Sequence, residues 1–592
     1  MKQIFQNLRN GETFIAEVPI PRPKAGQVLV RTAASLVSAG TERMVVEFAE
    51  KTLLGKARSR PDLVRQVLEK ARRDGVLTTL EAAFNRLDQP MPLGYCSAGI
   101  IAALGSGVRE WRVGQRVACA GGGYAVHAEY GCVPSQLLAA LPDHVSFEAA
   151  AFTTLGAIAM HGFRLGETQL GEKVAVVGLG LLGQLTVGVA LAAGCQVLGV
   201  DLDPQRVALA EKMGAQAVLR TQAEEAAQSF SRGRGCDAVL ICAVSSSSDP
   251  IELAGSIARD RARIVAVGAV GLNVPRKIYY EKELTLLNSR SYGPGRYDPV
   301  YEEEGMDYPI GYVRWTEGRN MEAFVDLLAS HRLDVQPLIS HRFPIESAPQ
   351  AYELILGKKK EPFLGVLLTY PGGPEETPLS RPAVSQPAAP AASQEKIQVI
   401  RLGVLGAGNF AATIMLPALR GVPRIQRKTI VSASGSSARH AAQKFNFRDA
   451  SSDESQVIGN PAVNTVMILT RHDQHARQVI ASLEAGKQVF CEKPLAITLA
   501  ELEEIQETLE TVPQKIAFQP LLMVGFNRRF APLSTRLAGF LSRRREPLAM
   551  HYTINAGFLP ASHWINHPQQ GGRIIGECCH FIDLMAFLAG DP

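Results

Sequence analysis

Two short segments of this 592-residue chain each join an apolar run, a glycine-rich loop and the start of a helical pattern. They read KVAVVGLGLLG over 173–183 and IRLGVLGAGNFA over 400–411. In this context the first glycine makes a tight turn, the second admits a pyrophosphate, and the third small residue lets helix pack on strand. The helix N-terminus then offers free N–H groups to the phosphates. The sequence predicts two dinucleotide-binding α/β domains, with cofactor contacts at Gly178, Gly180, Gly183, Gly406, Gly408 and Ala411.

A stretch rich in proline and alanine separates the two segments. Residues 371–396 are dominated by Pro, Ala, Ser and Gly and show no apolar periodicity, which is typical of an interdomain linker. This linker divides the chain into a first unit, 1–370, and a second unit, 397–592. Apolar residues make up 46% and charged residues 20% of the chain, as in ordinary globular proteins.

Charge and apolar patterning limit the partners we expect. The chain has 62 basic and 57 acidic residues, a net charge of +5, whereas nucleic-acid binders usually carry a stronger basic bias. The most apolar window, 181–200, is interrupted by Gln184 and Gly188, so it predicts a helix and a strand rather than a membrane span. The N-terminus lacks an apolar run of signal-peptide length. We expect a cytoplasmic protein with no nucleic-acid partner and no integral membrane segment.

The strand after each glycine loop bears on the choice of cofactor. In the first unit that strand ends at Asp201, 18 residues after Gly183. A carboxylate there accepts hydrogen bonds from the ribose 2′-OH and repels a 2′-phosphate, which favours NAD, although Asp201 could also cap the next helix. The second unit has no acid there. Ser434 and Arg439 could hold a 2′-phosphate or form an ordinary turn, so NAD and NADP both stay open.

Nearly all of 1–370 resembles the medium-chain dehydrogenase/reductase superfamily. The matching segments are 26–31, 104–108, 111–117, 211–215 and 339–348. The resemblance implies a GroES-like domain over 1–150, completed by 335–370, and a Rossmann domain over 151–334.

The zinc-binding positions of that superfamily are altered here. Ala39 stands where zinc-dependent members have a cysteine, and Tyr95 and Cys96 replace a His-Glu pair. A catalytic zinc needs about three N, O or S ligands, which Cys96 and Glu42 do not supply. The sequence therefore predicts that the first unit binds no zinc.

Two segments distinguish the first unit from its relatives. Residues 51–86 form a basic, helical-looking insertion, which could meet an anionic substrate or a membrane surface, or could be a solvated helical face. Residues 289–319 are rich in tyrosine and arginine. Aromatic rings beside charged groups suit sugar hydroxyls, so Tyr292, Arg296 and Tyr297 are candidate substrate contacts. The alternative is a subunit-contact loop.

The second unit resembles the glucose–fructose oxidoreductase, inositol dehydrogenase and MocA family (Gfo/Idh/MocA). The resemblance rests on 470–475, on Glu492-Lys493-Pro494 and on 571–583, where Gly576 and Cys578 depart from the family pattern. It implies Lys493 and His580 as the proton shuttle for a carbinol, because lysine and histidine in a cleft can take up and release that proton. It also implies cofactor contacts at Ser434, Glu492 and Pro494, a substrate contact at Asp583, and a cis Lys493–Pro494 bond.

The same resemblance divides the second unit into a Rossmann domain, 397–518, and an incomplete C-terminal α/β domain, 519–592. The whole chain is similar to bi-domain oxidoreductases of surface-polysaccharide biosynthesis. It implies a homo-oligomeric, NAD(P)-dependent enzyme acting on a sugar or nucleotide sugar. Two alternatives stay open: a non-catalytic NAD-binding scaffold or sensor, and a zinc-free quinone or enoyl reductase in the first unit.

Overall fold

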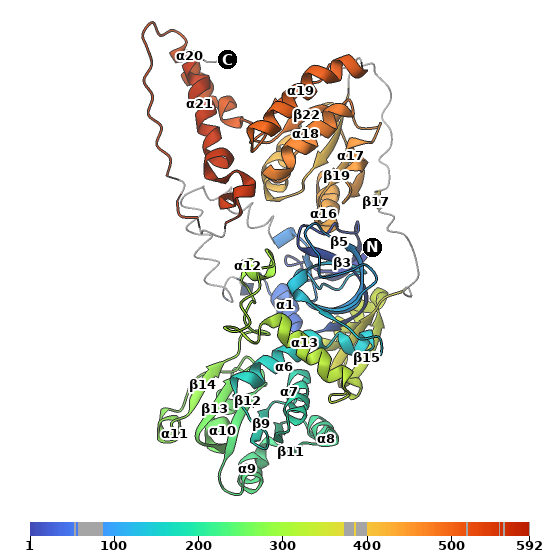
Figure 1. The fold of residues 1–592 in the computed structure, drawn as a ribbon, viewed down its shortest axis with the longest axis vertical. Coiled ribbons are helices and arrows are strands. Elements are labelled where there is room, and N and C mark those ends of the chain that lie inside the picture. Colours follow the sequence, from blue (N-terminus) through green and yellow to red (C-terminus); the bar gives the residue numbers. More distant parts are fainter. Residues whose placement is uncertain are drawn as a thin grey trace. The chain divides into compact units, whose positions relative to one another are not determined.

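The computed structural model describes residues 1–52, 55–56, 58, 87–371, 384–385, 399–516, 519–555, 557–559 and 563–590. Most of the predicted linker and most of the basic segment 51–86 lie outside these residues. The chain separates into one unit of Met1–Glu17 and Pro23–Leu379 and another of Val18–Arg22 and Ser380–Pro592. The fold is α/β with GroES-like and Rossmann-type parts, which confirms the predicted fold class (Figure 1).

A mostly antiparallel sheet, in which only β15 and β16 pair in parallel, forms the β-rich part of the first unit. Its strand order is β15-β16-β3-β5-β6-β8, and β7 also pairs with β3. The long central strand β3 (Gln27–Val37) is buried on most of its length by apolar side chains. The bounds of its partners are β5 (Cys96–Leu104), β6 (Arg116–Ala120), β7 (Tyr130–Pro134), β8 (Leu138–Ala140), β15 (Ile339–Pro344) and β16 (Gly365–Thr369). Late strands β15 and β16 therefore complete a sheet begun near the N-terminus.

A smaller sheet of β1 (Lys2–Gln6), β2 (Thr13–Glu17) and β4 (Met91–Pro92) and the helix α1 (Thr41–Glu50) accompany this part. Helix α14 (Ala348–Ile355) packs its apolar side against the same core. Ile4, Val46 and Tyr352 meet there with at most 1% exposure.

Six parallel strands form the first Rossmann sheet, in the order β11-β10-β9-β12-β13-β14. Numbered along the chain this order is 3-2-1-4-5-6, the doubly wound arrangement that binds dinucleotides at the carboxyl ends of its strands. The strands are β9 (Lys173–Val177), β10 (Gln196–Asp201), β11 (Gln216–Leu219), β12 (Cys236–Ile241), β13 (Ala258–Ala266) and β14 (Thr285–Asn288).

Helices cover both faces of this sheet because its strands are apolar on both sides. Val176 of β9 packs with α7 (Leu181–Ala192), whereas Val177 packs with α9 (Ala223–Ser231) and α10 (Asp249–Ile257). The remaining long helices here are α6 (Thr153–Leu165), α8 (Pro204–Lys212) and α13 (Glu317–Ala329).

The second unit repeats the same strand order. Its sheet runs β20-β19-β18-β21-β22-β23, with the short β17 (Val384–Ser385) antiparallel at the edge. The strands are β18 (Ile400–Leu405), β19 (Ile425–Val431), β20 (Asp449–Ser451), β21 (Thr465–Ile468), β22 (Gln488–Cys491) and β23 (Leu522–Val524). Strand β23 is parallel to β22, so the Rossmann sheet continues past residue 518, the predicted domain boundary.

Helices α16 (Gly435–Phe445), α18 (His475–Glu484) and α19 (Leu499–Ile516) flank this sheet. After Val524 the described residues form helices and no strand, chiefly α20 (Pro532–Leu541) and α21 (Cys579–Ala589). No helix in the described part of the chain is both long and apolar enough to cross a membrane.

Candidate functional site

The first glycine loop connects β9 to α7 with three differently constrained glycines. A Cβ on Gly178, whose φ is +93°, would lie 2.5 Å from the Ala243 backbone nitrogen. A Cβ on Gly183 would lie 1.8 Å from the Gly178 carbonyl oxygen. A Cβ on Gly180, by contrast, would have no nearer neighbour than Arg206 Nη1 at 4.0 Å. Packing within the chain thus explains the first and third glycines, and space for a bound phosphate explains the second.

The second loop shows the same division. A Cβ on Gly406, at φ +102°, would lie 2.5 Å from the Leu469 carbonyl oxygen, whereas one on Gly408 would meet nothing within 4 Å. Ala411 is 1% exposed and packs in the core beside the sheet. Both loops therefore leave an open position in the middle, where a pyrophosphate fits.

These glycines predict opposite consequences of substitution. Gly180→Val should preserve folding and weaken dinucleotide binding at least tenfold, because the side chain enters space that only a ligand needs. Gly183→Ala should instead destabilise the unit, because overpacking at this contact costs about 1–3 kcal/mol. Nucleotide titration by fluorescence and thermal unfolding separate the two effects. A Gly180→Val protein with normal affinity would contradict this assignment of the loop.

Asp201 ends β10 and turns its carboxylate toward the glycine loop. It accepts hydrogen bonds from the backbone N–H groups of Leu179 at 2.5 Å, Leu202 at 2.8 Å and Asp203 at 2.9 Å. The cap of α8 is Asp203, whose side chain accepts from the Gln205 N–H. Asp201 is therefore not the cap of that helix.

Arg206 is a residue that sequence reasoning missed at this site. Its Nη1 lies 3.9 Å from Asp201 Oδ2, and both residues line the same cavity. Its position two residues into α8 was the only sequence signal, and a single arginine on a helix is too common to be informative. A guanidinium beside Asp201 can contact the ribose hydroxyls or a 2′-phosphate.

A cavity of about 970 Å³ connects the glycine loop to the β-rich part of the first unit. Gly178, Gly180 and Asp201 line it together with three predicted substrate contacts, Tyr292, Arg296 and Tyr297. These three residues follow β14 and so lie at the same carboxyl edge as the glycine loop. The structure brings the predicted cofactor and substrate residues of this unit into one space, large enough for a dinucleotide part and a small substrate.

Hydroxyl groups line this cavity at Tyr95, one of the positions compared above with zinc ligands. Tyr95 donates to Ser38 Oγ at 2.7 Å and lies 3.5 Å from Thr41 Oγ1. The Cys96 side chain is fully buried, and burial raises the pKa of its thiol well above the ordinary value, so the thiol stays protonated at neutral pH.

Glu42 is directed into a buried hydrogen-bond network. Its carboxylate accepts from the Ser38 N–H at 2.9 Å, lies 3.2 Å from His127 Nε2, and accepts a short hydrogen bond from Tyr352. Burial alone would raise the pKa of Glu42, but His127 and these hydrogen bonds lower it below the usual value. Within the described ranges, no three His, Cys, Asp or Glu side chains are placed to hold a metal ion. The absence of zinc from the first unit stays a prediction.

In the second unit, Lys493 and His580 lie together beyond the carboxyl end of β22. Lys493 Nζ donates to the Gly576 carbonyl at 2.6 Å, and the Lys493–Pro494 bond is cis. Burial, then the charge of Lys493, lowers the pKa of His580 to about 4. The buried Nδ1 of His580 has no partner among the described residues. A neutral imidazole, with one nitrogen that has no partner among the described residues, therefore lies beside the Lys493 side chain.

Two histidines hold the surroundings of Lys493 in place. His475 is fully buried, and its two ring nitrogens lie 2.7 Å from the Pro494 carbonyl and 3.2 Å from the Thr470 carbonyl. His472 Nδ1 lies 2.9 Å from the Gln570 carbonyl, and burial lowers the pKa of His472 to about 4. Glu492, 9% exposed, has a pKa raised by burial. The 470–475 motif thus positions the lysine segment, a role that its sequence did not reveal.

Two predicted contacts of the second unit have partners within the chain. Ser434 caps α16, accepting from the Ser437 N–H. Both oxygens of Asp583 accept hydrogen bonds from the Arg529 guanidinium, and Asp583 is 8% exposed. Their roles toward cofactor and substrate stay predictions.

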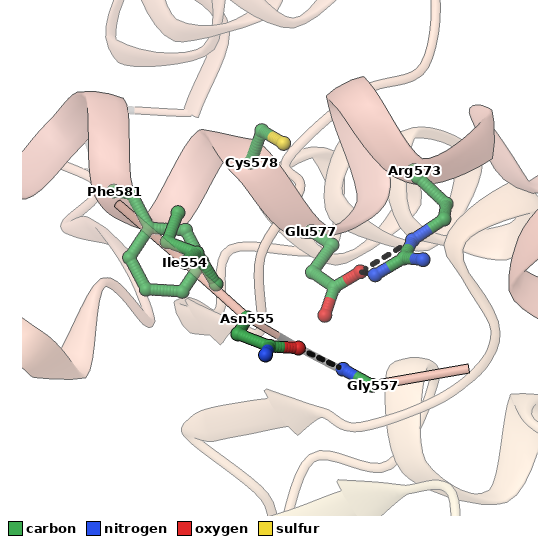
Figure 2. Close-up of a pocket in the computed structure, with 7 residues that line it drawn as sticks. All are labelled: Ile554, Asn555, Gly557, Arg573, Glu577, Cys578 and Phe581. Atoms are coloured by element: carbon green, nitrogen blue, oxygen red, sulfur yellow. Dashed lines mark hydrogen bonds and ion pairs between the residues drawn. The ribbon is translucent and has the colours of Figure 1, made fainter. Parts of the chain in front are cut away.

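A separate pocket of about 430 Å³ lies along the helical segment that contains His580. Figure 2 shows Arg573 and Glu577 joined by an ion pair on one side, with Ile554 and Phe581 on the other. Lys493 and His580 are not among its lining residues.

Three segments match models of known protein families. Residues 71–143 match the alcohol dehydrogenase GroES-like domain, and residues 182–304 match the zinc-binding dehydrogenase model. Residues 400–518 match the oxidoreductase family with an NAD-binding Rossmann fold.

Individual relatives match the first unit. Sorbitol dehydrogenase of Homo sapiens is 27% identical over 297 residues, covering 45% of this chain and 76% of the relative. D-xylulose reductase of Scheffersomyces stipitis is 27% identical over 322 residues, covering 46% and 81%. The crystal structure of galactitol-1-phosphate dehydrogenase from Escherichia coli superposes with a TM-score of 0.48 at 22% identity, covering 62% of this chain and all of that one.

Proposed function

Because the chain joins a medium-chain dehydrogenase/reductase unit to a Gfo/Idh/MocA oxidoreductase unit, we propose that this dehydrogenase/reductase acts on a sugar, sugar alcohol or nucleotide sugar with NAD(P). The names of its relatives, sorbitol dehydrogenase and D-xylulose reductase, support a polyhydroxylated substrate for the first unit. Its biological setting in this proposal is surface-polysaccharide biosynthesis.

The observation that carries the proposal is the juxtaposition of Lys493 and His580 at the carboxyl edge of the second sheet. A bound nicotinamide would accept the hydride from a carbinol carbon there. Lys493 holds the hydroxyl oxygen and His580 receives its proton at the unpartnered Nδ1. His475 keeps the lysine segment in place through its hydrogen bond to Pro494. Gly406 and Gly408 would hold the pyrophosphate, with Ala411, Ser434, Glu492 and Pro494 beside the dinucleotide.

In the first unit, Gly178, Gly180 and Gly183 would hold the pyrophosphate and Asp201 the adenine ribose, which favours NAD. The unit works without zinc in this proposal. The side chains themselves support this. Ala39 has no atom that could bind a metal, the Cys96 thiol is protonated, and the Glu42 carboxylate is hydrogen-bonded to His127 and Tyr352. Proton transfer there must come from side chains.

A cofactor-reduction screen tests the proposal directly. The purified full chain is offered sugar alcohols and nucleotide sugars, with NAD⁺ and NADP⁺ in separate reactions, and zinc is measured in the same preparation. We expect turnover of at least one polyhydroxylated substrate by protein holding well under one zinc per chain. Stoichiometric zinc that survives dialysis and is required for turnover would refute the zinc-free assignment. Nucleotide binding without turnover of any substrate would favour the scaffold alternative.

Asp201→Ala should weaken NAD binding to the first unit more than NADP binding. A hydrogen bond to a charged group contributes about 1.5–3 kcal/mol, or roughly tenfold to a hundredfold in affinity. Titration of NADH and NADPH fluorescence in a full chain carrying Gly408→Val, which blocks the second site, measures both affinities. Asp203→Ala is the matched control, because that carboxylate caps α8. Equal losses of affinity for NADH and NADPH would show that Asp201 only holds the Leu179 backbone in place through its hydrogen bond.

A further inference from the structure

A buried polar cluster lies beyond the carboxyl end of β14 in the first unit. Tyr292 and Arg296 come from the loop after this strand, Glu302 from the short helix α12 (Pro299–Glu302), and Glu317 from the first turn of α13. Tyr292 is 2% exposed, Glu302 7% and Glu317 0%. Burying ionisable groups costs free energy unless they are paired or serve a function.

Ion pairing satisfies only some of the charged and polar groups in this cluster. Arg296 forms a short ion pair with Glu302. Glu317 hydrogen-bonds to the side chains of Glu302 and Tyr292, and its carboxyl oxygens and the Tyr292 hydroxyl have no further partner among the described residues. Asn320 donates to the Tyr292 carbonyl at 2.9 Å, yet its own side-chain oxygen also lacks a partner. Most buried polar atoms in folded proteins are hydrogen-bonded, so the remaining hydrogen-bonding capacity of Tyr292 and Asn320 is available to a ligand.

The backbone of this loop is held in a sparsely populated conformation. Ser291 has φ +57° and Tyr297 φ +67°, although neither is glycine, and both line the cavity. A Cβ on Gly293, at φ +126°, would lie 2.7 Å from Asn320 Nδ2. Strained positions of this kind cluster at ligand-binding and active sites. The loop thus presents Tyr292 to the cavity that Gly178 and Gly180 also line.

The Glu317 carboxyl and the Tyr292 hydroxyl both hold their protons at neutral pH. Burial, then the Glu302 carboxylate, raises the pKa of Glu317 to about 9, against the opposing charge of Arg296 and the nearby Tyr292. Burial also raises the pKa of Tyr292 well above its ordinary value, with a contribution from Glu317. Tyr292 and Glu317 therefore lie close enough to influence each other, and both are proton donors.

We propose that Tyr292 is the catalytic acid of the first unit and that Glu317 supplies its proton, so that this unit reduces a ketose carbonyl without a metal. The inference rests on the proposed function, in which this cavity would hold a reduced nicotinamide dinucleotide as the source of the hydride for the carbonyl carbon. The C=O π bond then breaks, and its electron pair stays on the oxygen. That oxygen takes the phenolic proton of Tyr292, Glu317 reprotonates the phenolate, and water reprotonates Glu317. The net reaction consumes one reduced dinucleotide, one carbonyl and one proton.

The kinetic test uses the full, zinc-depleted chain carrying Lys493→Met, so that the second unit contributes no turnover. The probes are D-fructose and D-xylulose with NADH and with NADPH. We expect Tyr292→Phe to lower kcat by about 10²–10⁴-fold, the usual contribution of a general acid, with little change in cofactor KM. Tyr279→Phe is the matched control, since its hydroxyl donates to the Ile251 carbonyl instead and it does not line the cavity.

Glu317→Gln is tested by a readout that a merely structural role would not move. We expect kcat of the parent to fall as pH rises through about 9, and this limb to disappear in Glu317→Gln. Infrared spectra of the chain without nucleotide should show a protonated-carboxyl band at neutral pH that Glu317→Gln lacks. Glu322→Gln, on the same helix α13, should keep that band.

Each negative result has a defined meaning. Full activity of Tyr292→Phe, or an infrared spectrum unchanged by Glu317→Gln, overturns the proposal. The proposal is also overturned if the Lys493→Met chain reduces neither D-fructose nor D-xylulose while the parent chain is active. In that case the proposed function of the second unit still holds. If the parent chain is inactive on every substrate, the proposed function fails as well.

Discussion

Lys493→Met should lower the rate of hydride transfer in the second unit by about 10²–10⁴-fold and leave dinucleotide affinity nearly unchanged. The reason is a division of roles: Gly408 leaves space for a pyrophosphate, whereas Lys493 lies beside His580, where the proposed function has it hold the substrate hydroxyl. Methionine keeps the length of the side chain and removes its charge and its protons. Steady-state rates on the best substrate of the screen, together with nucleotide titration, measure the two quantities separately.

Lys515→Met is the matched control, because Lys515 is an exposed residue near the end of α19. It should leave both rate and affinity unchanged. If Lys493→Met retains the full rate on that substrate, the second unit is not the catalyst for it. Activity would then have to come from the first unit.

His127→Ala should destabilise the first unit by about 1–3 kcal/mol, the usual cost of leaving a buried hydrogen-bonding group without its partner. His127 is fully buried between Ser35 Oγ, 2.7 Å from Nδ1, and the Glu42 carboxylate, 3.2 Å from Nε2. Removing the imidazole leaves Glu42 with the Tyr352 hydroxyl and one backbone N–H. Urea unfolding of the full chain, followed through its first-unit transition, measures the loss.

The pH dependence of Glu42→Gln provides a second measurement. Because folding lowers the pKa of Glu42, its stabilising contribution is fully present above the ordinary carboxyl value and is lost as pH falls through the folded-state value. The difference between the parent and Glu42→Gln should therefore narrow in acid. Glu47→Gln, which removes an exposed pair with Arg43 on the same helix, should change stability by less than about 0.5 kcal/mol. If His127→Ala leaves the free energy of unfolding of the first unit unchanged, the network around Glu42 does not stabilise the fold.

The two Rossmann sheets were predictable because their signals are local. An apolar strand, glycines at fixed spacing and a following helix lie within twelve residues of sequence, and the structure has β9 with α7 and β18 at those places. The positive φ of Gly178 and Gly406 follows from the tight turn that the pattern requires. The predicted cis Lys493–Pro494 bond is also confirmed.

The sixth strand of the second sheet was not predicted. Strand β23 is only three residues long, Leu522–Val524, and it belongs to the sheet through its pairing with Val489–Cys491 of β22. A run of three residues is too short to show the alternation of apolar and polar side chains that predicts a strand, so the sequence could not show where the Rossmann sheet ends. The Rossmann sheet extends beyond residue 518 because β23, which follows α19 in the sequence, pairs with β22.

What the sequence by itself determined is the set of chemical groups whose spacing along the chain reflects their role: the glycine loops, Asp201 and the Glu492-Lys493-Pro494 segment. What only the tertiary structure decided is which distant groups meet. Glu42 meets His127 and Tyr352, and Tyr292 meets Glu317, because separate strands and helices end at the same place. Burial then changes the chemistry of these groups, since desolvation penalises their charged forms to an extent that depends on neighbours far away in sequence.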